Sequence, residues 1–294
     1  MNDKPTKENL DEKLAKLSKE ILQMKIAVGA LLALTVIMFA GFNFLIGMVA
    51  ALASFVFIFL IRKKLQKKKS AAYDLIKTVI QKHIDLTEYS PNGHIPEYAI
   101  ENTRLMPHWD EFSGSDLVQG TYKGVNIAFS DIHLVDIETY TDSDGNRQTR
   151  RDTVFQGQWI VCELPKTIKR AVRLKEKPKI RLLPHKSDVE TENIAFNKKY
   201  QILTDDPHTM FYILTPHFME YILSADLLAE GQTYFCFEGN HVYIAIDNRR
   251  DAFKMKSKHE SVEKLQERIE KEVKYLIEII DELMKNEYLF GGEK

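Results

Sequence analysis

The feature that most constrains this chain is a long run without charge near its N-terminus. No Asp, Glu, Lys or Arg occurs between Lys25 and Arg62. A bilayer core is crossed by ~20 helical residues, so the run of about 36 residues is too long for one straight span and long enough for two short ones. Gly41-Phe42-Asn43-Phe44, in its middle, suits a turn. The sequence therefore predicts a transmembrane hairpin over residues 26–61, with one tilted or re-entrant segment as the alternative.

Basic residues flank this run on both sides. Lys13, Lys16, Lys19 and Lys25 precede it, and a basic collar without Asp or Glu follows it. The collar consists of Arg62, Lys63, Lys64, Lys67, Lys68 and Lys69. Because basic flanks stay on the cytoplasmic side, only an even number of spans places both correctly. We expect a multi-pass protein of the cell inner membrane, with two spans and both termini cytoplasmic. A secretory signal peptide has a shorter apolar stretch and does not end in a basic collar.

Helical spacing continues beyond both ends of the predicted hairpin. Residues 1–25 are predicted to form an amphipathic cytoplasmic helix with a coiled-coil seam. Its seam residues are Leu10, Leu14, Leu17, Ile21 and Met24. Apolar residues from Leu65 to Ile80 predict a basic juxtamembrane helix over residues 62–90. Two arrangements are open: antiparallel pairing of these helices within the chain, or oligomerisation through the first seam.

The remaining sequence predicts an α+β fold, in which a cytoplasmic antiparallel-sheet domain over residues 91–256 is flanked by helices. Alternating apolar residues favour strands over 122–129, 132–140 and 153–163, and the last two are predicted to form a long hairpin. A tight hairpin is predicted over 232–247 around Gly239-Asn240.

Helices in this part of the chain have recognisable start signals. Asp206-Pro207 and Thr215-Pro216 predict two consecutive helices, with Asp206 as N-cap. A C-terminal amphipathic helix and tail occupy 257–294, and the apolar stripe is expected to pack on the domain or on a partner helix. Cys162 and Cys236 lie in apolar runs, so we expect reduced, buried thiols.

A second basic segment lies within residues 166–186. Basic residues alternate there with apolar ones, so an extended conformation would place them on one face. They are Arg173, Lys175, Lys177, Lys179 and Arg181. One interpretation is contact with anionic lipid headgroups or another polyanion. The other is a Lys-rich edge strand that resists aggregation.

A polar group at His108, Trp109, Asp110 and Glu111 is the candidate ligand site. The alternative is an ordered connection between helix and sheet, with Trp109 covering the edge of the core. The chain has no phosphate-binding Gly-rich loop, no G-x-S-x-G, no H-E-x-x-H and no C-x-x-C. No two of the 9 histidines show metal-ligand spacing on one helical face. We expect no metal and no cofactor.

Two segments carry a family resemblance. FNKKYQILTDD, from Phe196 to Asp206, and YILTPHFME, from Tyr212 to Glu220, resemble the bacterial membrane-protein family called domain of unknown function 3137. Residues 153–157 and 235–246 are also similar to its pattern. The resemblance implies two N-terminal spans before a cytoplasmic domain. It implies no reaction, because the family has no established activity.

The absence of catalytic motifs and the presence of helical seams favour a non-enzymatic role. We expect a membrane-anchored, cytoplasmic-facing binding or scaffolding protein. Its expected partners are the lipid bilayer, anionic lipid headgroups, and a second copy or another membrane protein bound through the N- and C-terminal helices; nucleic acid is not expected. The alternatives are a membrane-bound hydrolase or transferase with a non-standard site, and an accessory subunit of a transporter or envelope complex.

Overall fold

A computed structural model describes residues 7–40, 44–143, 145–177, 189–229, 231–251, 253 and 262–291, without the side chains of 7–15, 44, 68, 69, 225–229 and 262. The helices are α1 (Lys7–Phe39), α2 (Phe44–Ile80), α3 (Glu97–Thr103), α4 (Ile194–Lys199), α5 (Pro207–Ile213), α6 (Pro216–Ala229), α7 (Val262–Met284) and α8 (Glu287–Phe290). The strands are β1 (Asp85–Ser90), β2 (Glu111–Tyr122), β3 (Val125–Thr141), β4 (Arg147–Glu176), β5 (Tyr200–Thr204) and β6 (Gln232–Asp247).

The chain divides into two units. The first consists of Met1–Val79 with Met255–Arg268, and the second of Ile80–Lys254 with Ile269–Lys294. The second unit contains the sheet and is called the sheet domain below. The α+β class with an antiparallel sheet is confirmed.

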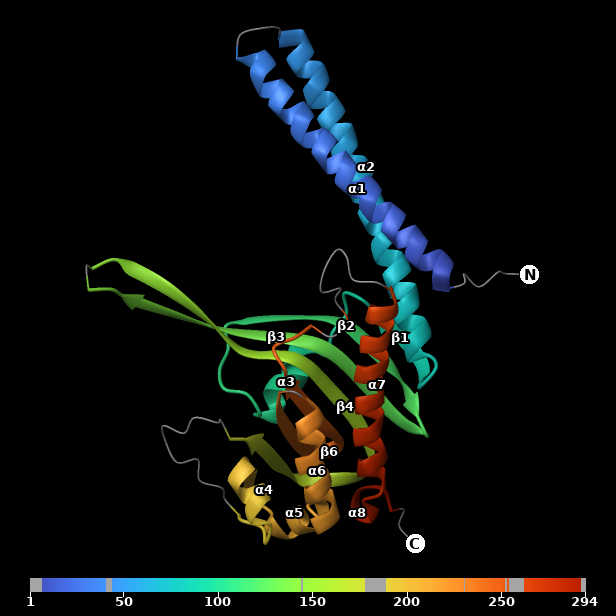
Figure 1. Cartoon of the computed structure of the whole chain (residues 1–294). Helices are drawn as coiled ribbons and strands as arrows, with labels where there is room; N and C mark the ends of the chain where they lie inside the picture. The colour runs from blue at the N-terminus through green and yellow to red at the C-terminus, as the bar shows by residue number, and fades with distance from the viewer. Residues whose placement is uncertain are drawn as a thin grey trace. The chain divides into compact units, whose positions relative to one another are not determined.

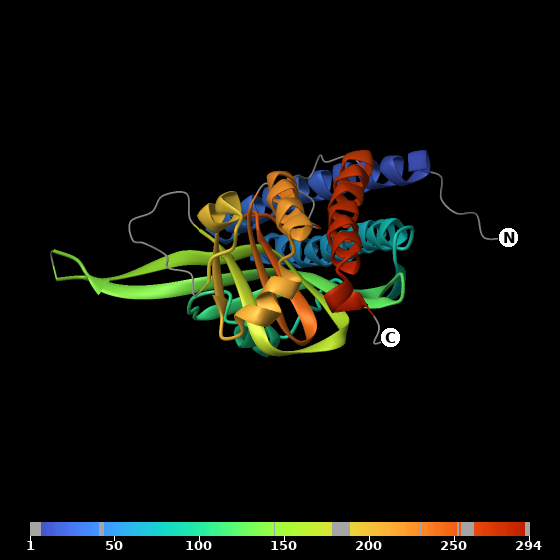
Figure 2. The ribbon, with the colours of Figure 1, turned by 90° about the horizontal axis from the view of Figure 1, so that it is seen from below.

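In the first unit, α1 and α2 run antiparallel and side by side (Figure 1 and Figure 2). Ile21, Val28 and Ile61 form a buried cluster between them, and Lys64 Nζ lies 2.5 Å from Glu20 Oε2. The helices break between Phe39 and Phe44, where the turn was predicted. Pairing within the chain is therefore confirmed for this part of α1. The seam residues Leu10 and Leu14 lie outside the described side chains.

The predicted helix over 62–90 ends too late. The helix stops at Ile80, and residues 85–90 form β1 instead. β1 pairs antiparallel with β2, with Asp85 opposite Thr121. Residues 85–90 are extended because they pair with β2, which is distant in sequence. The sheet therefore begins at residue 85, before the predicted start of the domain at residue 91.

The sheet contains six strands in the described residues, and β4 is its longest. β3 and β5 pair with different parts of β4, while β6 follows β4 from residue 157 to residue 175. The predicted long hairpin is confirmed as β3–β4. The predicted strand boundaries are wrong: Lys123-Gly124, with φ of 48° and 83°, forms the turn between β2 and β3, and residues 125–141 are one strand.

The tight hairpin predicted around Gly239-Asn240 is wrong. Residues 232–247 form the single strand β6, which pairs with β4 along its length. Gly239 has a φ of 59° and lies opposite Ile168, where the register between the strands shifts. The glycine therefore serves an irregularity in a long two-stranded pairing rather than a chain reversal.

For the described residues of the second basic segment, the edge-strand interpretation is also wrong. Val172 pairs with Thr204 of β5 on one side and with Phe237 of β6 on the other. Arg173 and Lys175 consequently lie on an internal strand.

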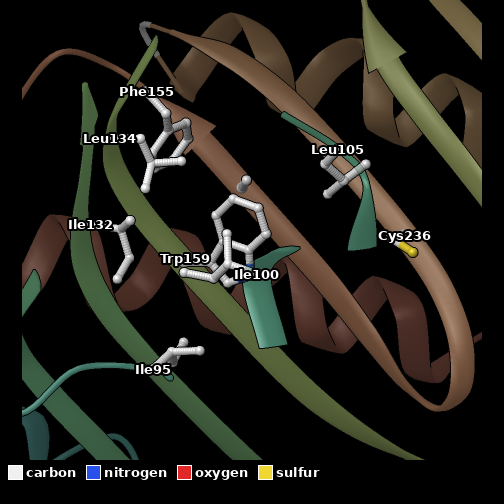
Figure 3. Close-up of a cluster of buried hydrophobic side chains, with 9 residues drawn as sticks. Ile95, Ile100, Leu105, Ile132, Leu134, Phe155, Trp159 and Cys236 are labelled. Carbon is white, nitrogen blue, oxygen red and sulfur yellow. The ribbon is translucent and has the colours of Figure 1, made fainter. Parts of the chain in front are cut away.

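The core lies on both faces of the sheet. Figure 3 shows the cluster on one face, where the Phe155 and Trp159 rings meet edge-on with centroids 5.5 Å apart. This cluster also contains Ile95, Ile100, Leu105, Ile132, Leu134, Cys236 and Ala245. On the other face, Phe129 stacks with Phe253 at 6.0 Å.

The helices after β5 agree with the sequence. α5 and α6 begin at Pro207 and Pro216, and Asp206 caps α5 by accepting a hydrogen bond from Thr209 N–H. α7 buries its apolar stripe within the chain, and Lys123 Nζ lies 2.6 Å from Asp281 Oδ1 of this helix. Of the two alternatives for the C-terminal helix, packing on the domain is therefore the one observed. The stripe residues in the sheet domain are Ile269, Val273, Leu276, Ile280 and Leu283.

Candidate functional site

The first unit presents apolar side chains to its surroundings. Val36 on α1 is 68% exposed and Phe55 on α2 is 72% exposed. Both α1 and α2 are long and apolar enough to cross a membrane by length and composition. In the basic collar that follows, Arg62, Lys63 and Lys67 are exposed. Lys68 and Lys69 lie outside the described side chains.

The second basic segment is only partly accessible. Arg173 Nε donates to Thr103 O at 2.6 Å, and its Nη2 lies 3.4 Å from Glu238 Oε2. Lys177 Nζ donates to Asn197 O at 2.6 Å. Burial, together with the charge of Arg173, lowers the pKa of Lys175. Lys179 and Arg181 lie outside the described residues, so lipid contact through this segment stays a prediction.

The four residues of the predicted polar site separate into different roles. Trp109 packs against the core cluster and donates from Nε1 to Glu97 Oε1 at 2.8 Å. Glu111 forms an ion pair with Arg151 of β4. His108 Nε2 lies 3.5 Å from Asp110 Oδ1.

Asp110 also has a structural role. Its Oδ2 accepts a hydrogen bond from Ile137 N–H at 2.7 Å, and this bond holds the pKa of Asp110 below its ordinary value. Asp136, which sequence reasoning missed, lies with His108 and Asp110 in a group whose possible ligand atoms are within 4.8 Å of one another. His108 and Asp110 are exposed, and exposed acidic groups are common at protein surfaces without a ligand.

A second group of carboxylates is more buried. Asp116, Asp131 and Asp251 each place an oxygen within 4.8 Å of the others, and we call them the aspartate cluster. They come from β2, from β3 and from the segment after β6. Asp116 is 8% exposed, Asp131 is 5% exposed and Asp251 is half-buried. Carboxylates in this environment are unusual enough to require an explanation.

A β-bulge positions Asp116. The register passes from Ser115 opposite Asp131 to Val118 opposite Phe129, so β2 holds an extra residue there. Asp116 has a φ of 59°, in the left-handed region that is uncommon for residues other than glycine. Bulges re-aim side chains, and this one brings the Asp116 carboxylate to Asp131.

The surroundings of the aspartate cluster hold its carboxylates in place. Tyr89 Oη donates to Asp116 Oδ1 at 2.7 Å, and Phe253 N–H donates to Asp131 Oδ2 at 3.3 Å. Burial raises the pKa of Asp116, and the negative charge of Asp251 acts in the same direction. The hydrogen bond from Tyr89 opposes this shift.

Sequence reasoning missed the aspartate cluster because its members lie far apart in the chain. One signal was present: Asp131 follows Ile127 and Phe129 at alternate positions, so it occupies an otherwise apolar face of the strand. Nothing in the local pattern indicates the partners, since the β2 bulge and the end of β6 supply them.

Comparison with known proteins finds one family whose model matches part of the chain. Residues 153–285 match the model of a family described as "Protein of unknown function (DUF3137)". The match covers less than half of the chain and supports membership of this family. The resemblance seen in residues 196–220 is thereby confirmed, and the DUF3137 match begins within β4 and extends through α7. It includes Asp251 and excludes Asp116 and Asp131.

No curated protein matches this DUF3137 chain in sequence. Among solved structures, it is similar to the crystal structure of the mycobacterial trehalose monomycolate transport factor A, TtfA, with 11% sequence identity and a TM-score of 0.36. That likeness covers 70% of this chain and 94% of the other. Similarity at this level does not establish a shared fold or function.

Proposed function

We propose that this DUF3137 protein is a two-span membrane anchor joined to a cytoplasmic binding or scaffolding domain, at the inner face of a bacterial cytoplasmic membrane. The observation that carries the proposal is the exposed apolar surface of α1 and α2. Large side chains such as Ile26, Val36, Val49 and Phe55 are each more than half exposed. Exposing such a surface to water costs free energy through the hydrophobic effect. Exposing it to the hydrocarbon core of a bilayer does not.

The basic collar supports the orientation. Exposed Arg62, Lys63 and Lys67 follow the second apolar stretch without an intervening acid. Short basic flanks remain in the cytoplasm, and each basic residue near an anionic bilayer contributes ~1 kcal/mol of attraction. The proposal therefore assigns the sheet domain, which follows the collar, to the cytoplasmic side.

A binding role for the sheet domain is supported by its filled interior and by its extended ribbon. Trp159, Phe155 and their neighbours fill the space against one face of the sheet (Figure 3). The C-terminal part of β3 and the N-terminal part of β4 project beyond the rest of the sheet as a two-stranded ribbon (Figure 1 and Figure 2). Tyr140 on this ribbon is 51% exposed. Such a ribbon offers a protein partner both strand edges and exposed side chains.

Alkaline carbonate extraction of membranes that contain the full chain tests the anchor. We expect the wild-type chain to stay in the membrane pellet. The double variant Leu32→Lys/Phe55→Lys should be released, because a Lys at the centre of a span costs about 2.5–3.5 kcal/mol. Leu65→Lys, on α2 beyond Arg62, is the matched control and should behave like the wild type. Release of the wild-type chain by carbonate would contradict the proposal.

A further inference from the structure

Gln158 of β4 provides an observation independent of the aspartate cluster. It is 1% exposed, and neither Nε2 nor Oε1 of its side chain has a hydrogen-bond partner among the described residues. Buried amides are nearly always hydrogen-bonded, because an unpaired one loses its hydration without compensation. Gln158 therefore requires an explanation that the described residues around it do not supply.

The sheet register shows where this amide points. Gln158 lies directly opposite Asp131 on the neighbouring strand. Ile132 and Trp159, the next residues along their strands, belong to the core cluster on one face (Figure 3). Because side chains alternate along a strand, Asp131 and Gln158 both point to the other face. Directly opposed residues have Cβ atoms about 4.5–5.5 Å apart, so the Gln158 side chain lies beside that of Asp131, a member of the aspartate cluster.

The chemistry of these donors selects a class of ligand. Three carboxylates whose oxygens lie within 4.8 Å of one another repel when they are ionised, and the amide oxygen is a further hard donor. Oxygen ligands around Ca²⁺ lie about 2.3–2.6 Å from the ion, so those on opposite sides are about 5 Å apart. The spacing of the cluster fits this geometry. The set contains no His or Cys, the donors that Zn²⁺ sites favour.

We propose that Asp116, Asp131, Asp251 and Gln158 bind a divalent cation of the hard, oxygen-preferring class, with Ca²⁺ as the best fit. The ion neutralises the carboxylates and gives the Gln158 oxygen a partner. It ties the β2 bulge and β3 to the segment that follows β6. The site is independent of the membrane anchor. The sequence led us to expect no metal, because the four residues come from distant segments and form no ligand motif along the chain.

The test uses the full chain in detergent, stripped with EDTA. Thermal unfolding and titration calorimetry are measured with Ca²⁺, Mg²⁺ and Mn²⁺ added separately. We expect Ca²⁺ to raise the Tm and to bind with measurable heat. Mg²⁺ or Mn²⁺ acting in its place, through the same residues, supports the site and fixes its preference. If none of the three ions binds or shifts the Tm, the proposal is wrong.

Variants locate the ion. Asp131→Asn should weaken binding by at least ~10-fold, and Asp251→Asn serves the same purpose if the first variant does not fold. Gln158→Leu should also weaken binding, yet it should be at least as stable as the wild type in EDTA, because it removes a buried amide without a partner. A residue with a purely structural role would not give this combination.

The exposed group of His108, Asp110 and Asp136 supplies the matched control. Asp136→Asn removes a carboxylate from that surface group and leaves the aspartate cluster intact. We expect it to bind Ca²⁺ as the wild type does. Loss of binding in Asp136→Asn, with binding retained in Asp131→Asn, would place the ion at the surface and overturn the proposal.

Discussion

At the scale of single residues, the stability of the sheet domain depends on a few large buried side chains. Trp159 is fully buried and contacts Phe155 edge-on. We expect Trp159→Ala to lower the free energy of unfolding by about 3–5 kcal/mol, because it leaves a cavity in a close-packed core. Tyr98, which is 68% exposed, is the control, and Tyr98→Ala should change stability by less than ~0.5 kcal/mol. Denaturant unfolding of the full chain in detergent measures both, and equal losses would contradict the account.

The buried carboxylate of Asp247 makes stability depend on pH. Burial raises its pKa, while Arg249 and the hydrogen bond from Gln156 N–H oppose that shift. Since the folded pKa exceeds the unfolded value of about 3.9, the stabilising contribution is present below pH ~3.9 and is lost as the pH rises through the folded pKa.

Asp247→Asn removes this dependence and keeps an acceptor for Gln156 N–H. The Tm of the variant relative to the wild type should therefore be higher at pH 7 than at pH 4. Asp205→Asn, at an exposed position, controls for the loss of one negative charge and should show no such trend. A relative Tm that is lower at pH 7 than at pH 4 would show that the sign is wrong.

Burial also determines thiol reactivity. Cys162 and Cys236 are free and buried, and burial raises the pKa of each thiol to about 12. Because the thiolate is the reactive form, maleimide at pH 8 should label both at least ~100-fold more slowly than a cysteine introduced by Ser143→Cys at the exposed tip of the β3–β4 ribbon. Labelling rates in the folded chain and in denaturant provide the measurement. Fast labelling of the wild-type chain without denaturant would contradict the placement of these thiols.

At the scale of elements, Asn286 connects the C-terminal helices to α5. Its Oδ1 accepts from Tyr288 N–H and Leu289 N–H and so caps α8, while its Nδ2 donates to Ile213 O at 2.8 Å. We expect Asn286→Ala to cost about 2–3 kcal/mol, because buried main-chain groups lose their partners. Asn286→Ser keeps a neutral capping oxygen and loses the amide donor, so its stability should fall between those of the alanine variant and the wild type. Denaturant unfolding tests this order, and an unchanged alanine variant would contradict it.

Elements with local signals were predictable, and those defined by distant partners were not. Asp206-Pro207 specifies the start of α5, because Asp206 caps the helix and Pro207 has a fixed φ. The alternation of apolar and polar residues along β3 and β4 predicts their hairpin. By contrast, β6 pairs along β4 through Gly239, a residue that local rules assign to a turn. The bulge at Asp116 depends on the register of β2 against β3. Sequence reasoning therefore found the apolar hairpin and the basic collar but not the aspartate cluster.

At the scale of the whole molecule, the chain combines an apolar helix pair with a sheet domain that extends beyond the family match. The DUF3137 segment, residues 153–285, lacks β1, β2 and β3, which share one sheet with β4. Asp251 and Gln158 lie inside this segment, while Asp116 and Asp131 lie outside it. The proposed ion would therefore join the matched segment to the strands that precede it.

Anchoring with both termini in the cytoplasm is the central claim, and reporters fused after Lys294 test it most directly. The account predicts that a fluorescent protein at this position is bright and that alkaline phosphatase there is inactive in intact cells. Replacing the six residues of the basic collar with Gln should raise phosphatase activity, because the positive charges that keep this flank in the cytoplasm are removed. An active phosphatase on the wild-type chain would place the sheet domain outside the cytoplasm and contradict the account.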